Sequence, residues 1–151
     1  MVDFKAAFDK GQAAYEKSRS EKQEIDGTLR TFSQQIHEFT DGQLEIRTEK
    51  QTRREPVRGL FGLPGEEKVT TYTALIACLT STGKTAELSR FEIAREGYPV
   101  TIDIGGRMLN CHDKASLEQG LASLLQDPVN AGKLRDLLNS ARNAAPSQEQ
   151  A

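Results

Sequence analysis

The stretch that decides the fold runs from Phe4 to Phe39 and reads FKAAFDKGQAAYEKSRSEKQEIDGTLRTFSQQIHEF. Every large apolar side chain of this stretch lies at a position reached from Phe4 by alternating steps of four and three residues. Such a 3.5-residue repeat is typical of a helix that lays one narrow apolar seam against a partner. The seam positions are Phe4, Phe8, Gly11, Tyr15, Ser18, Lys22, Ile25, Leu29, Phe32, Ile36 and Phe39.

We expect this helix to begin after Asp3, a suitable N-cap, and to end near Gly42, which can take the left-handed conformation. An unbroken helix of that span is about 55 Å long, which exceeds the diameter of a domain of this size. Either part of it projects, or it breaks in the polar stretch 16–24, where Ser18 and Glu21 have capping-box spacing. The Glu, Lys and Gln residues there favour one long helix.

The large apolar residues of the seam fall into two groups on either side of the polar stretch. We expect the second group to dock on the domain, and the first to be covered by a second copy or by the same chain folded back. The same repeat is also typical of a long helix packed on its own chain. Because the domain is too short to cover the whole helix, the sequence predicts a homodimer. The residues assigned to self-association are Phe4, Phe8, Tyr15, Ile25 and Leu29.

After Gly42 the apolar residues alternate with a period of two, which indicates β-strands. Predicted strands are 43–50, 69–79, 88–94, 100–104 and 108–111, with an irregular segment at 51–67. In the last hairpin, Gly105-Gly106 forms the loop, which places Ile102 opposite Leu109 and Val100 opposite Cys111. Two short helices follow, the first capped by Asp113 or Ser116 and the second starting at Asp127-Pro128.

These elements predict an α+β fold with a long N-terminal helix, an antiparallel five-stranded meander sheet and two short C-terminal helices. Helices would cover one face of the sheet and leave the other partly open. We expect a single domain over 1–143 with a projecting N-terminal helix, and a disordered tail over 144–151.

The chain has 151 residues and a net charge of −2, which gives no global attraction to nucleic acids or anionic lipids. It lacks the basic stretch and apolar run of a secretory signal, and its longest apolar stretch, Ala74–Leu79, is too short to span a bilayer. Its two cysteines fit a reducing compartment. The expectation is a cytoplasmic protein without a membrane segment.

The segment from Arg47 to Arg58 is the best candidate for a contact surface, because its arginines run into an apolar loop hinged by Gly59, Gly62 and Gly65. Apolar anchors with a cationic rim suit a protein partner. The alternatives are that the loop packs into the domain's own core, or that the arginines bind nucleic acid. The residues assigned to partner binding are Arg53, Arg54, Arg58, Leu60, Phe61 and Leu63.

Short motifs offer little chemistry. Gly83-Lys84-Thr85 resembles only the end of a phosphate-binding loop, and Cys78 stands where the first glycine is required. In Cys111-His112-Asp113, neighbouring strand residues point to opposite faces, so the thiol and imidazole diverge. Two cysteines and two histidines lack the short spacing that nucleates a zinc site. No metal or cofactor is predicted.

The sequence therefore predicts a non-catalytic intracellular interaction module, such as an adaptor, chaperone or inhibitor, that binds another protein and self-associates through its first helix. This prediction rests on architecture rather than on a motif. The alternative is a nucleic-acid-associated factor that uses Arg47–Arg58, and the third is a small enzyme with a reactive Cys111.

Overall fold

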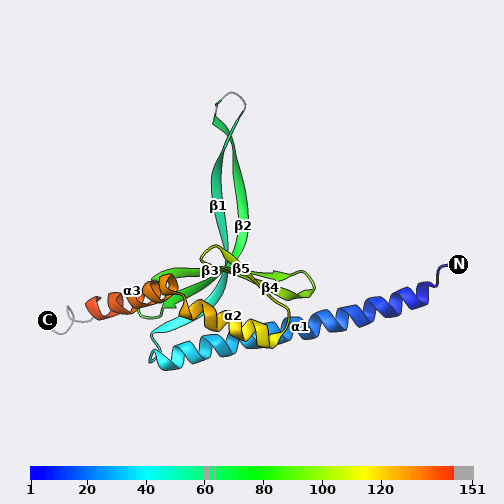
Figure 1. The fold of residues 1–151 in the computed structure, drawn as a ribbon, viewed down its shortest axis with the longest axis horizontal. Helices are drawn as coiled ribbons and strands as arrows, with labels where there is room; N and C mark the ends of the chain where they lie inside the picture. The colour runs from blue at the N-terminus through cyan, green and yellow to red at the C-terminus, as the bar shows by residue number, and fades with distance from the viewer. Residues whose placement is uncertain (60–61, 63, 145–151) are drawn as a thin grey trace.

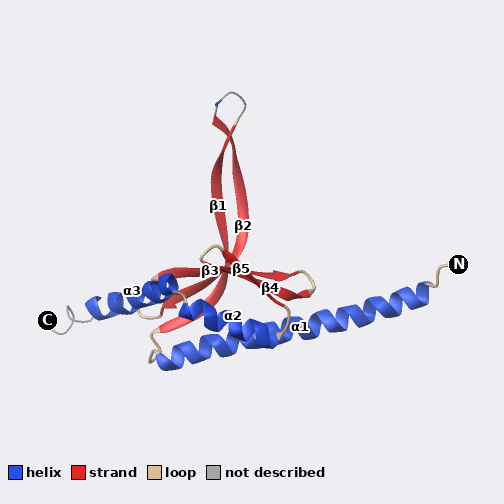
Figure 2. Cartoon of the chain, in the orientation of Figure 1, coloured by secondary structure: helices blue, strands red, loops and turns tan. Residues whose placement is uncertain are grey.

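The computed structural model describes residues 1–59, 62 and 64–144. Three helices and five strands follow one another in the predicted order (Figures 1 and 2). They are α1 (Phe4–Phe39), β1 (Leu44–Arg58), β2 (Pro64–Leu79), β3 (Thr85–Ala94), β4 (Gly97–Ile104), β5 (Arg107–Cys111), α2 (Lys114–Gln126) and α3 (Pro128–Ala144). The α+β fold is as predicted, while the expected tail falls almost wholly on residues 145–151, outside the described part.

The first helix is continuous through its polar middle. The Asp3 carboxylate accepts hydrogen bonds from the backbone N–H groups of Lys5 and Ala6, both at 3.1 Å, which satisfies free donors of the first turn. At the other end Gly42 has a φ of 77° and donates its N–H to the carbonyl of His37 at 2.7 Å. The helix thus begins and ends where the capping residues predict.

The five strands form one antiparallel meander in the order β1-β2-β3-β4-β5. In the β4–β5 hairpin Ile102 pairs with Leu109 and Val100 pairs with Cys111, as the sequence predicts. Asp113 caps α2 in a capping box with Ser116, and α3 begins at Pro128. The carboxylate of Asp127 accepts a hydrogen bond from the N–H of Asn130 at 3.2 Å, which caps α3.

The segment 51–67, expected to be irregular, is mostly an extension of β1 and β2. Pairing between these strands runs from Leu44 with Leu79 to Pro56 with Glu67, and then shifts before Arg58. Pro56 lies on β1, which is an edge strand, the part of a sheet where proline is tolerated. The prediction failed because this part of the hairpin has no buried apolar face, so the period-two signal is lost.

The hydrophobic core lies between the sheet and a layer of three helices, which covers one of its faces (Figure 1). Its largest fully buried side chain is that of Phe91 on β3. All three helices and all five strands contribute to it. Members of the core include Ile25, Ile36, Leu44, Leu75, Leu79, Phe91, Val100, Ile102, Leu117, Leu121, Leu124 and Leu137.

Candidate protein interaction surfaces

The first half of α1 extends away from the body of the protein (Figure 1). Every residue from Met1 to Lys17 is exposed, and we call residues 4–17 the helical arm. Phe4, Phe8 and Tyr15 keep 79%, 65% and 60% of their surface exposed. These three aromatic side chains share one helical face because they follow the 3.5-residue spacing.

The second half of the same seam packs on the chain itself. Ile25 and Ile36 are each 1% exposed, and Leu29 and Phe32 pack against the core from its edge. Ile25 and Leu29 were assigned to self-association, but the structure places them against the chain's own sheet and helices. Of the assigned residues, Phe4, Phe8 and Tyr15 remain accessible to another molecule.

The arm leaves the body at a defined anchor, the first residues of β4. The backbone N–H of Tyr98 donates to the Glu21 carboxylate at 3.2 Å, and the Tyr98 hydroxyl donates to Glu24 at 2.8 Å. Burial, and then the hydrogen bond to Glu24, raise the pKa of Tyr98 well above its usual value. Gly97 lies so close that a Cβ there would be 2.5 Å from the Glu21 carboxylate. The body therefore holds α1 from Glu21 onward.

A second projection is formed by β1 and β2 and points away from the helical layer (Figure 2). From Thr73 toward the tip, β2 has no pairing with β3, so only two strands remain. We call residues 50–58 and 64–73 the ribbon arm. At about 3.4 Å per residue it is roughly 30 Å long.

The two faces of the ribbon arm and its root differ in charge. On one face Arg47 pairs with Glu49 at 2.6 Å and Arg53 pairs with Glu55 at 3.2 Å. The other face carries Lys50 beside Thr73 and Arg54 beside Val69, and Glu67 lies opposite Pro56 nearer the tip. Within the described residues neither of these two cations forms an ion pair.

The predicted partner-binding residues are therefore only partly placed. Arg53 and Arg54 are exposed on opposite faces of the ribbon arm, and Arg58 is the last residue of β1. Leu60, Phe61 and Leu63 lie outside the described residues. Arg53 is neutralised by Glu55, so Arg54 is the more available cation for a partner.

The sheet face opposite the helices is not an open apolar surface at the root of the ribbon. Ala74 is 0% and Ile76 is 4% exposed, although no helix packs on them. The strand register places Arg47 beside Ile76 and Arg90 beside Ala74, so that aliphatic stems of charged side chains cover them. Arg90 also stacks over the Tyr72 ring at 4.5 Å from its centroid. The chain's own residues thus occupy this part of the predicted open face.

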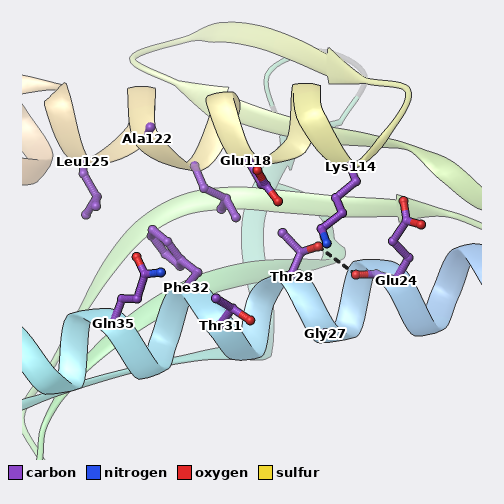
Figure 3. A pocket seen from close by; sticks show the side chains of 11 residues that line it. Glu24, Gly27, Thr28, Thr31, Phe32, Gln35, Lys114, Glu118, Ala122 and Leu125 are labelled. Carbon is purple, nitrogen blue, oxygen red and sulfur yellow. Dashed lines mark hydrogen bonds between the residues drawn. The ribbon is translucent and has the colours of Figure 1, made fainter.

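Sequence reasoning missed a groove between α1 and α2 (Figure 3). It has a volume of about 590 Å³, and Phe32 of α1 lies across it from Leu125 of α2. At Leu125 it meets a second hollow of about 420 Å³ between the end of α1 and α3, beside the 67% exposed Phe39. The only sequence signal was that the seam continues to Phe39, one turn beyond the buried Ile36.

The Cys111-His112-Asp113 triplet is not arranged for catalysis. The Cys111 thiol is 2% exposed, and burial raises its pKa. A reactive thiol needs a lowered pKa and access to solvent, which is the opposite environment. His112 is exposed, and Asp113 caps α2 through Ser116, whose hydrogen bonds lower the pKa of that carboxyl.

Over residues 1–59, 62 and 64–144, no cluster of histidine, cysteine and carboxylate side chains could hold a metal ion. No helix in this part of the chain is long and apolar enough to cross a bilayer. The two projecting arms are therefore the most distinctive surfaces of the described structure. No family model, curated protein or solved structure matches the chain.

Proposed function

We propose that this protein is a non-catalytic interaction module that self-associates through its helical arm. One observation carries the proposal: a single apolar seam packs on the chain's own core between Ile25 and Ile36 and exposes three aromatic side chains in the arm. Soluble monomers rarely leave such contiguous apolar surface to water, and it commonly marks an interaction site.

Energetics also favour a partner for the arm. The arm continues a helix whose second half packs on the body, so it needs no nucleus of its own, but its residues are exposed and gain little from packing on the body. Each aromatic side chain can bury about 150–250 Å², at roughly 25 cal/mol per Å². Association would therefore stabilise the helix and remove the exposed rings from water together.

Sedimentation equilibrium of the wild type and of Phe8→Lys tests the proposal. We expect the wild type to dimerise with increasing concentration and Phe8→Lys to remain largely monomeric, because a charge would enter the apolar seam. Ala13→Lys is the matched control: it adds the same charge about 140° around the helix from Phe8. A wild type that stays monomeric up to roughly 100 μM, where a weak complex of standard type would be populated, contradicts the proposal.

A second, different protein would bind to the ribbon arm. Its projecting strands and the exposed side chains of Arg53 and Arg54 are the features that support this part of the proposal. A projecting ribbon presents its side chains to a partner, and cationic side chains suit a partner with a complementary negative surface. Capture experiments with Arg54→Glu, compared with Arg53→Glu, would test whether the face that carries Lys50 and Arg54 is the one used.

A nucleic-acid-associated role is the second candidate, favoured by Lys50 and Arg54 on one face of a projecting ribbon. β-ribbons are known to enter DNA grooves. This role can be tested by fluorescence anisotropy with duplex DNA at low salt. The double variant Lys50→Ala/Arg54→Ala should then bind more weakly than the double variant Arg47→Ala/Arg53→Ala. Equal losses, or no binding by the wild type, would count against it.

A further inference from the structure

We propose that two copies pair antiparallel along their helical arms, with Phe4 of one packed against Tyr15 of the other and Phe8 packed against Gly11. This inference rests on the self-association proposed above and adds its direction and register. It accounts for the apolar side chains left exposed at this end of the molecule.

The body of the protein argues against a parallel pair. From Ile25 to Ile36 the seam is covered by the chain's own core, and Glu21 already contacts Tyr98 at the start of β4. In a parallel pair, the partner's helix would continue along the same seam into the volume that this body occupies. In an antiparallel pair, the partner's helix instead runs outward past Phe4, and the two bodies lie at opposite ends.

The spacing of the seam sets the register. Antiparallel pairing that places Phe4 opposite Tyr15 also places Phe8 opposite Gly11, because both pairs have residue numbers that sum to 19. A Cβ added to Gly11 meets nothing within 4 Å in its own chain, so the space above it is open to a partner's ring. A shift by one heptad that lengthens the overlap would set Phe4 against Lys22 and Phe8 against Ser18, which leaves both rings on polar side chains. The opposite shift would set Phe4 against Phe8 but leave Tyr15 outside the contact between the arms.

The residues that flank this seam are compatible with close approach. Ala7 of one arm comes beside Ala14 of the other, and Lys5 comes beside the uncharged Gln12. Small residues allow helices to approach closely, and no pair of like charges is forced together at the flanks. These two flanking pairs therefore bring no like charges together.

A hollow at the base of the arm supports the same arrangement. It has a volume of about 730 Å³ and is lined by Tyr15, Ser18, Arg19 and Ile93, among others. Ile93 is 42% exposed although it lies on the core face of β3. In the antiparallel register the residues just before Phe4 of the second copy arrive here, so Val2, itself 68% exposed, can cover Ile93.

The apolar surface that the two arms can bury against each other is the size expected for a weak dimer. Six aromatic rings, each able to bury about 150–250 Å² and exposed by 60–79%, offer roughly 600–1,000 Å². With Val2, Ile93 and the alanines, the total approaches about 1,000 Å², the lower bound for a specific interface. We therefore expect dissociation in the micromolar range rather than a permanent complex.

Distances between spin labels on the full chain test the direction. Labels would be attached to Asp9→Cys and, in a second protein, to Lys17→Cys; the wild type is the control, because its buried Cys78 and Cys111 should take up no label. In the proposed register, position 9 of one copy is displaced along the helix axis from position 9 of the other by one residue. The same displacement between the two copies of position 17 is 15 residues, or about 22 Å. The Lys17 distance should exceed the Asp9 distance by roughly 10 Å or more.

Equal distances at the two positions in a protein that sediments as a dimer would overturn the antiparallel register and leave self-association standing. A labelled protein without dipolar coupling that sediments as a monomer would overturn both proposals. A longer distance for Asp9 than for Lys17 would exclude this register and indicate contact through another part of the chain.

Discussion

The division of one seam into a buried and an exposed half can be tested by two alanine substitutions. Ile25→Ala and Phe8→Ala remove large apolar side chains from the same face of α1. Ile25 is 1% exposed and belongs to the core, whereas Phe8 is 65% exposed. The structure therefore predicts a large loss of stability for the first substitution and almost none for the second in the monomer.

The magnitudes follow from burial. Ile25→Ala removes three carbon atoms, and at about 0.8 kcal/mol each the transfer cost alone is about 2.4 kcal/mol. The cavity that remains raises the expected loss to about 3–5 kcal/mol. Phe8→Ala should change the monomer by less than about 0.5 kcal/mol, as for surface positions without special contacts.

Urea unfolding followed by circular dichroism measures both losses. The comparison is made at about 1 μM, below the micromolar association expected for weak complexes, and again at high concentration. At high concentration the wild type should gain apparent stability by mass action, and Phe8→Ala should lose that gain. If Phe8→Ala costs as much as Ile25→Ala at low concentration, the arm packs on its own body and the division of the seam is refuted.

Three further outcomes follow from the structure. Gly97→Ala should lower the free energy of unfolding by about 1–3 kcal/mol, because Gly97 has a φ of 126° and abuts Glu21. Gly27→Ala is the control: its added methyl group meets nothing within 4 Å, so it should raise the free energy of unfolding by up to about 1 kcal/mol. Thermal unfolding measures both. Alkylation of Cys111 at neutral pH should be slow in the folded protein and fast in urea; rapid labelling of the folded protein would revive the thiol enzyme hypothesis. The pKa of Tyr98 is raised in the folded state. The contribution of Tyr98 to the stability of the fold should therefore be fully present below its pKa in the unfolded chain, about 10, and be lost as the pH rises above that value. The stability difference between wild type and Tyr98→Phe should therefore narrow between pH 8 and pH 11, and a difference independent of pH would contradict this.

Local signals in the sequence were enough for the order of the elements and several of their boundaries. Gly105-Gly106 together with alternating apolar residues defined the β4–β5 register, because a one-residue slip would turn both apolar faces toward water. Asp3, Asp113 and Asp127 marked the starts of the three helices through side-chain capping. These features depend on residues close in sequence, which is why they could be predicted.

The ribbon arm and the helical groove could not be predicted for a different reason. Residues 51–58 carry charges on both faces, so nothing in their pattern distinguishes a solvated ribbon from a loop. The groove between α1 and α2 depends on how far apart two helices sit, which no local pattern encodes. Likewise, the repeat from Phe4 to Phe39 showed that the seam needs a cover but not which molecule supplies it, so Ile25 and Leu29 were grouped with the arm.

The sheet edges help to explain why self-association falls to the helical arm. β1 is an edge strand with unpaired backbone groups, the usual template for joining two sheets. This strand carries Arg47, Lys50, Arg53 and Arg54, and Pro56 removes one donor. Charged side chains and proline on an edge oppose pairing with another strand. The other edge strand, β5, spans only five residues, so pairing there would give few hydrogen bonds. With both edges protected, the aromatic face of the arm is the surface whose burial offers the larger gain.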